Sequence, residues 1–161
     1  MVDWSNLVRE HSAAVYGVAW HILGHAQDAE DVVQEVFAEA HRQSDGVPVV
    51  CWAALLRRIA ACRALDALRR RRITKPLDGA QLAAGKEDPA AIAAGRELEA
   101  RLRMALAELA PREAEVFCLR YLEELSYRQI AQTLGISLTA TSTALYQARS
   151  RLEKLLIEPD L

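Results

Sequence analysis

The stretch that decides the fold is LSYRQIAQTLGIS, residues 125–137. Ser126 and Gln129 have the spacing of a capping box, which predicts that a short helix begins there. Gly135 can adopt the left-handed conformation of a tight turn, and Ser137 can cap a second helix. The pattern predicts a helix-turn-helix, although two short helices joined by a glycine turn also occur in ordinary helical bundles.

The second helix of this pair has an inward and an outward face by its spacing. The inward residues are Thr141, Leu145, Ala148 and Leu152. The outward residues are Ser142, Thr143, Tyr146, Gln147 and Arg149, and Arg128 lies on the preceding helix. A helix held in this way fits the major groove of DNA. Because residues 138–148 carry no charge, we expect weak binding to DNA that depends little on salt, and tighter binding with arginine at position 142 or 144.

Helical patterns also cover most of the remaining chain. Helices are expected at residues 4–23, 28–40, 50–72, 88–110 and from residue 111 onward. The second of these is expected to begin at Asp28, with Asp31 as its capping partner. Residues 74–87 contain proline and glycine but few large apolar side chains. We therefore predict an all-α fold of two small helical domains, residues 1–73 and 88–161, joined by a flexible linker at 74–87.

Composition excludes several classes of protein. Charged residues interrupt every long apolar run, and no basic segment followed by an apolar stretch opens the chain, so neither a membrane span nor a secretory signal is expected. Cys51, Cys62 and Cys118 form no Cys-x-x-Cys pair and are expected to be buried free thiols in a reducing cytoplasm. The histidines lack metal-binding spacing and no phosphate-binding loop is present. We expect no metal, no cofactor and no enzymatic activity.

The net charge is only −2, but the charges are concentrated. Residues 57–75 hold eight basic side chains and one acid, Asp66, whereas residues 26–39 hold five acids and no base. A local basic patch is the electrostatic mark of a nucleic-acid-binding surface. Each run is also compatible with a solvated helix face.

Four segments in this order resemble the extracytoplasmic-function (ECF) group of bacterial sigma factors. They are DAEDVVQEVF at 28–37, WAALLRRIA at 52–60 with LDALRR at 65–70, LAELAPREAEVF at 106–117, and the helix-turn-helix segment at 125–137. The resemblance covers nearly the whole chain. It implies a sigma factor that binds core RNA polymerase and directs it to promoters.

The resemblance also implies roles for particular residues. The polymerase-binding residues would be Glu30, Asp31, Gln34 and Glu35. The residues at the melted −10 element would be Asp45 and Gly46 in the loop that captures a flipped base, and Arg63, Arg69 and Arg70 on the basic helix. That loop is equally compatible with a simple connector. Cys62 stands where the family commonly has a polar residue, so we assign it to the core. The outward residues of the helix-turn-helix, with Arg128, would contact the −35 element.

Two other functions remain compatible with the sequence. A stand-alone helix-turn-helix regulator would explain the second half of the chain but would leave the acidic and basic helices without a function. A helical interaction protein is the third possibility. Members of the ECF group are often held inactive by an anti-sigma protein, and such a partner is a further expectation from the resemblance.

Overall fold

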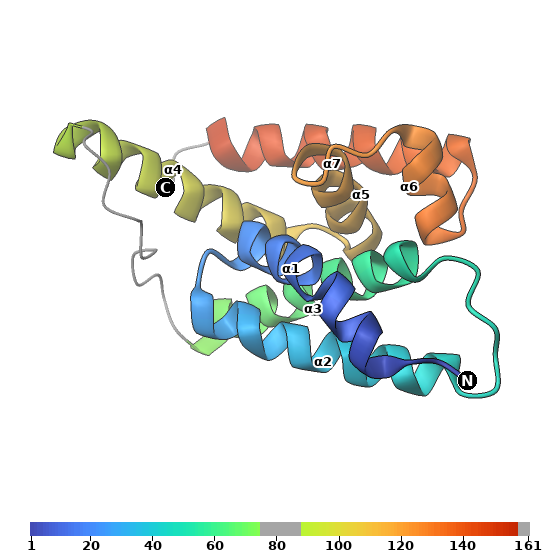
Figure 1. Ribbon diagram of the computed structural model, residues 1–161. Helices are drawn as coiled ribbons and strands as arrows, with labels where there is room; N and C mark the ends of the chain where they lie inside the picture. The colour runs from blue at the N-terminus through green and yellow to red at the C-terminus, as the bar shows by residue number, and fades with distance from the viewer. Residues whose placement is uncertain (75–87, 158–161) are drawn as a thin grey trace.

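The computed structural model describes residues 1–74 and 88–157, and within these ranges it contains seven α-helices and no strand (Figure 1). The helices are α1 (Trp4–Leu23), α2 (Ala26–Ser44), α3 (Trp52–Thr74), α4 (Pro89–Glu108), α5 (Pro111–Tyr121), α6 (Tyr127–Leu134) and α7 (Leu138–Ile157). The predicted all-α class is confirmed. The predicted linker, apart from Thr74, lies outside the described residues.

Helices α1, α2 and α3 pack on one another and form the amino-terminal lobe. The first helix ends at Leu23, as the sequence predicts, and Gly24 after it adopts the left-handed conformation. The predicted start of α2 at Asp28 is wrong, because α2 begins at Ala26 and His25 caps it by accepting a hydrogen bond from the Asp28 amide. Asp28 instead lies in the first turn, where a carboxylate favours the helix dipole and here also pairs with Arg71 at 3.4 Å.

Helices α4 to α7 form the carboxyl-terminal lobe, and local capping signals set most of their starts. Asp88 caps α4, and Pro89 occupies its first turn. The predicted capping box of Ser126 is present at α6, since its hydroxyl accepts from the Gln129 amide at 3.1 Å and the Gln129 side chain returns a bond of 2.9 Å. Gly135 has φ 67° and joins α6 to α7. The Ser137 hydroxyl accepts from the Ala140 amide at 3.0 Å and caps α7, as predicted.

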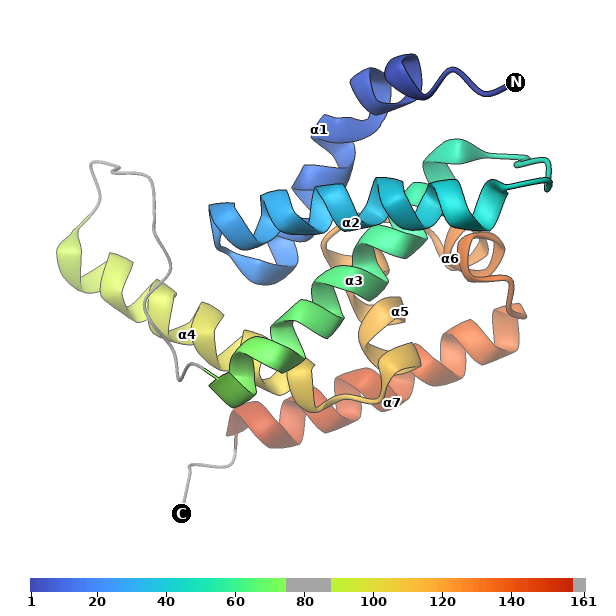
Figure 2. The same ribbon diagram turned by 90° about the horizontal axis from the view of Figure 1, so that it is seen from below.

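Helix α3 is the part of the amino-terminal lobe that also contacts the carboxyl-terminal lobe (Figure 2). On one side it packs against α1 and α2, and on the other against α4, α5 and α6. Its buried residues are Leu56, Ile59, Ala60, Ala61, Ala64, Leu65 and Leu68. They belong to a single hydrophobic cluster that runs from Val15 in α1 to Leu152 in α7. The lobes therefore share one core in this arrangement.

The first half of α4 contributes little to that core. The sequence predicts Ile92 and Leu98 on its apolar face, but Leu98 is 58% exposed and Ile92 is only half-buried. The buried residues of α4 begin at Ala105. In both views the first turns of α4 project beyond the neighbouring helices, which explains why an apolar spacing there does not produce burial (Figures 1 and 2).

We expect Gly135→Ala to lower the free energy of unfolding by about 1–2 kcal/mol, because the left-handed conformation places Cβ too close to the carbonyl oxygen. A Cβ at this site meets no neighbouring atom, so the cost is conformational only. Urea unfolding measures this change in the free energy of unfolding. The matched control is Gly95→Ala in the middle of α4, also without neighbours, where we expect stabilisation by about 0.5–1 kcal/mol. Equal effects of the two changes would contradict the turn geometry.

Candidate nucleic-acid interface

The four residues predicted to bind polymerase lie together on the outer face of α2. Glu30, Asp31, Gln34 and Glu35 are all exposed. Their apolar neighbours Ala29, Val32 and Val36 are buried, so the opposite side of α2 packs against the rest of the amino-terminal lobe. The structure thus presents an exposed acidic face on a rigid element, here called the α2 acidic face.

Glu39, the fifth acid of the same run, lies elsewhere. It accepts hydrogen bonds from Gln43 and Arg42 and pairs with Arg63 of α3 at 3.2 Å. The Gln43 and Arg42 hydrogen bonds, followed by the charges of Arg42 and Arg63, lower the pKa of Glu39 to about 2. Glu39 is therefore ionised at neutral pH. It forms an ion pair with Arg63, which the sequence analysis expects to contact the −10 element.

The loop predicted to capture a base is open to solvent. Asp45 and Gly46 are exposed, and Gly46 has φ 72°. Trp52, at the start of α3, forms an edge-on contact with Trp4, their ring centroids 5.4 Å apart, and Trp4 lies 4.9 Å from His41. The sequence gives no direct signal for this aromatic cluster, because its members come from three helices.

The three arginines of α3 predicted to contact DNA differ in their surroundings. Arg70 is exposed. Arg63 is bound to Glu39, as described above. Arg69 is 26% exposed, donates to Asp66 at 3.1 Å, and has a buried Nη2 atom without a hydrogen-bond partner. Only part of the predicted surface is thus open in this arrangement.

Other basic residues of α3 also have partners. Arg71 donates to the Leu23 carbonyl at 3.0 Å, within its own lobe. Arg57 lies 4.0 Å from Glu123 and Arg72 lies 3.8 Å from Glu108, and both of these acids belong to the carboxyl-terminal lobe. The sequence does not reveal these contacts, because the partners are far apart in the chain.

The three cysteines have different environments. Cys118 is buried, as predicted, and desolvation raises the pKa of its thiol to about 12. The prediction is wrong for Cys51, which is exposed in the loop before α3. Cys62 is half-buried and lines a hollow of about 280 Å³ between α2 and α3 on one side and α5 and α6 on the other. Burial, followed by the charges of Asp66 and Glu115, raises the pKa of Cys62.

The faces predicted for α7 are the observed ones. The four inward residues are buried, and Ser142, Thr143, Tyr146, Gln147 and Arg149 are exposed, as is Arg128 on α6. Tyr146 is 74% exposed. The Arg149 guanidinium lies 5.2 Å from the centroid of the Tyr121 ring, which places this cation at the edge of the outward face.

The prediction that an arginine at position 144 would tighten binding to DNA is wrong. Ala144 is 6% exposed and belongs to the hydrophobic cluster, so an arginine there would enter the core and not the DNA groove. It lies between the buried residues Thr141 and Leu145 on the helix, on the inward side.

Two further observations concern other kinds of site. Among the described residues, no group of three histidine, cysteine, aspartate or glutamate side chains could hold a metal ion. In residues 1–74 and 88–157, none of the helices has the length and hydropathy needed to cross a membrane.

Comparison with known families accounts for this geometry. The model of sigma-70 region 2 matches residues 7–73, and the model of sigma-70 region 4 matches residues 99–152. RNA polymerase sigma factor CnrH of Cupriavidus metallidurans is 32% identical over 165 residues, which cover 95% of this chain and 86% of CnrH. The chain belongs to the ECF sigma factors of the sigma-70 family. Sigma factors are transcription initiation factors and not enzymes; they bind core RNA polymerase and promoter DNA.

Two other curated relatives support the assignment. ECF RNA polymerase sigma factor SigE of Mycolicibacterium smegmatis is 33% identical over 160 residues, which cover 97% of this chain but 62% of SigE. The ECF sigma factor SigW of Bacillus subtilis is 24% identical over 165 residues, covering 95% of this chain and 88% of SigW.

Two solved structures have a similar fold. The structure of CnrH in complex with the cytosolic domain of CnrY has a TM-score of 0.61 and 28% identity, covering 95% of this chain and 86% of that one. The sigma factor RpoE in complex with the anti-sigma factor NepR from Bartonella quintana has a TM-score of 0.59, covering 99% of this chain and 100% of that one. At 20% identity the second comparison supports the fold alone.

We expect Ser142→Arg to steepen the salt dependence of binding to duplex DNA by about 0.9 in the log–log slope, the value for one additional phosphate contact. Fluorescence anisotropy of the full chain across a salt series measures this slope. Ala144→Arg is the matched comparison, because it adds the same charge two residues away on the buried side. It should instead lower the midpoint of thermal unfolding. An unchanged slope for Ser142→Arg would show that the outward face of α7 does not meet DNA.

Proposed function

We propose that this sigma factor docks on core RNA polymerase through the α2 acidic face and gives the polymerase its promoter specificity. The observation that carries the proposal is the exposed acidic face on a helix whose opposite side is buried. An acidic surface of this kind suits a basic partner surface, and complementary charges speed association and fix orientation. Because its partner is the transcription machinery, the chain works in the cytoplasm.

DNA contacts divide between the two lobes in this proposal. Asp45 and Gly46 with Arg63, Arg69 and Arg70 serve the −10 element. The arginines bind the backbone of the opened strand, and the loop holds an unstacked base. The outward face of α7, with Arg128, reads the −35 element by polar contacts with little electrostatic attraction. Tethering to polymerase supplies the effective concentration that this weak contact requires.

An anti-sigma protein is proposed as a regulatory partner. The support is the similarity to CnrH, whose structure was solved in complex with the cytosolic domain of CnrY. A stand-alone DNA-binding regulator remains the second candidate function. It would bind promoters without polymerase, which run-off transcription with and without core enzyme distinguishes.

Reversal of the α2 acidic face tests the docking. We expect the double variant Asp31→Lys, Glu35→Lys to weaken binding to core polymerase by about tenfold or more, since central charge pairs at interfaces are worth about 1.5 kcal/mol upward. Gel filtration and fluorescence titration with core enzyme measure the change. The matched control is Glu97→Lys, Glu153→Lys, which gives the same net charge at exposed sites on α4 and α7. Equal affinity of the two double variants would reject the docking site.

Removal of two α3 arginines tests strand opening. We expect Arg63→Ala, Arg70→Ala to reduce open-complex formation, detected by permanganate footprinting on a promoter selected with the wild-type holoenzyme, while affinity for core polymerase stays within about twofold. Arg9→Ala, Arg96→Ala is the control, because these arginines are exposed on α1 and α4. Unaltered footprints in the α3 variant would remove these arginines from the mechanism.

A further inference from the structure

The outward face of α7 is nearly uncharged, and Arg149 is the first cation along it. Residues 138–148 carry no charge. Arg149 is exposed and lies next to Tyr146 on the same face, since residues three apart are neighbours on a helix. Binding to duplex DNA draws much of its affinity from neutralised phosphates. The placement of this arginine therefore has a large effect on the attraction between the face and DNA.

The ring of Tyr121 holds the Arg149 guanidinium. The guanidinium carbon lies 5.2 Å from the centroid of the ring, which is within the distance of about 6 Å at which an aromatic face attracts a cation. Unlike a carboxylate, a ring restrains an arginine without neutralising its charge. Guanidinium groups stack on aromatic faces while their N–H groups remain able to donate to a phosphate.

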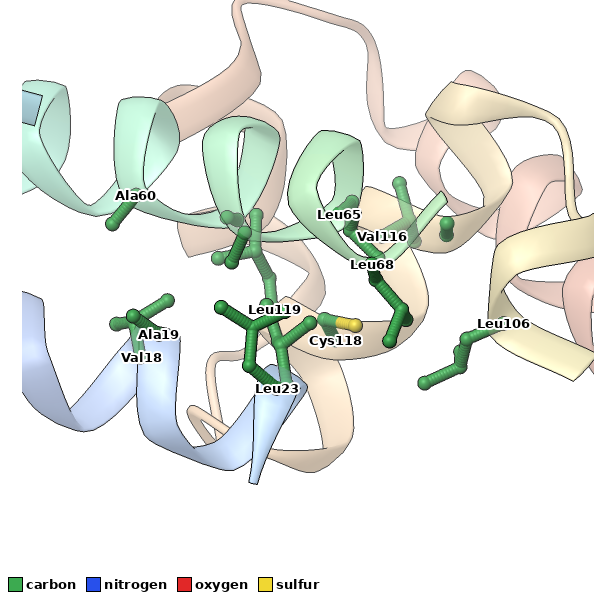
Figure 3. Close-up of a cluster of buried hydrophobic side chains, with 14 of the residues drawn as sticks. Val18, Ala19, Leu23, Ala60, Leu65, Leu68, Leu106, Val116, Cys118 and Leu119 are labelled. Atoms are coloured by element: carbon green, nitrogen blue, oxygen red, sulfur yellow. The ribbon is translucent and has the colours of Figure 1, made fainter. Parts of the chain in front are cut away.

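The Tyr121 ring is itself fixed, because it belongs to a helix anchored in the core. Tyr121 is the last residue of α5, and its ring centroid lies 4.7 Å from that of Phe117, one turn earlier. Figure 3 shows Val116, Cys118 and Leu119 of α5 in the cluster of buried hydrophobic side chains. The hydrophobic core thus determines where the ring lies, and the ring determines where the guanidinium lies.

Arg120 of the same lobe shows what a structural contact of this kind looks like. Its guanidinium carbon lies 5.6 Å from the centroid of the Tyr127 ring, and its Nη1 donates to the Leu125 carbonyl at 3.1 Å. Arg120 is half-buried and serves the turn between α5 and α6. Arg149 is exposed instead, and Tyr121 is 43% exposed, so DNA can reach this second pair.

We propose that Tyr121 is a positioning residue for DNA binding. Its ring holds Arg149 at the edge of the outward face of α7, where the guanidinium binds a phosphate of the −35 duplex. An arginine loses side-chain entropy when it binds, and an arginine already held by a ring loses less. Tyr121 acts through Arg149 and makes no contact with DNA itself. The inference rests on the proposed function for the contact between α7 and the −35 element.

A double-mutant cycle tests this arrangement with Tyr121→Leu, Arg149→Ala and the two combined. The readout is fluorescence anisotropy of the full chain on a duplex that carries the −35 element of a promoter selected with the wild-type holoenzyme. We expect Tyr121→Leu alone to weaken binding about two- to fivefold, the effect of an exposed cation–π contact. In the Arg149→Ala background the same change should have no effect, because the group that the ring positions is gone.

Two conservative variants separate the ring from its hydroxyl and the guanidinium from its charge. Tyr121→Phe keeps the aromatic face and should bind DNA like the wild type. Arg149→Lys keeps the charge but lacks the planar group that stacks on a ring, so binding should weaken about twofold or more. The matched control is Arg151→Lys at an exposed arginine of the same helix, which should change the affinity less than Arg149→Lys does.

Circular dichroism and the midpoint of thermal unfolding show whether Tyr121→Leu remains folded. If it does not, Arg149→Lys and its control carry the test, since both leave the ring and the core unaltered.

Four results would overturn the inference and leave the proposed function standing. They are no effect of Tyr121→Leu, additive effects in the cycle, an affinity of Tyr121→Phe as low as that of Tyr121→Leu, and equal affinities of Arg149→Lys and Arg151→Lys. The proposed function fails in a different way. In that case neither Arg149→Ala nor Ser142→Arg would change the affinity for DNA or its salt dependence.

Discussion

The burial of α3 is the constraint on which the rest of the structure depends. This helix carries seven of the 20 lysine and arginine residues of the chain, yet a wide arc of its surface is apolar and contacts helices of both lobes. A helix with a narrow apolar stripe needs one neighbouring layer, whereas one with so wide an apolar arc is stable only between two. The arginine side chains of α3 consequently extend from the edges of this packing. There they form ion pairs with acids of α2, α4 and the α5–α6 turn.

The packing of α3 between helices of both lobes also determines which of the proposed functional surfaces are exposed. The α2 acidic face and the outward face of α7 are both exposed in this arrangement, so the surfaces proposed for contact with polymerase and for the −35 element are available. The α3 surface is only partly open, because Arg69 is mostly buried and pairs with Asp66, and Arg63 pairs with Glu39.

How much the sequence predicts depends on the range of the interaction. Predictions from local signals are confirmed. They are the Ser126 and Gln129 capping box, the left-handed Gly135 and the Ser137 cap, each of which involves residues within a few positions of one another. The inward and outward faces of α7 followed from spacing for the same reason. The residues proposed for polymerase and DNA are exposed except for Arg63 and Arg69, which are partly buried, and the roles of all of them remain predictions.

Interactions between distant residues could not be predicted. Asp28 looked like a cap by its type, but the Arg71 that pairs with it lies 43 residues away. Leu98 has helical spacing but stays exposed, and Ala144 looks neutral in the sequence yet lies in the core. The contact of Arg103 with the end of α1 spans 81 residues. Spacing identifies which side of a helix is apolar, but not what covers it.

The central claim is that α3 joins the two lobes through one shared hydrophobic core. Its most direct test is a distance between spin labels at Glu10→Cys on α1 and Glu153→Cys on α7, both exposed, with Cys51 and Cys62 replaced by alanine. Double electron–electron resonance should give one narrow distance distribution, because a shared core fixes the two helices relative to each other. A broad distribution would contradict the claim.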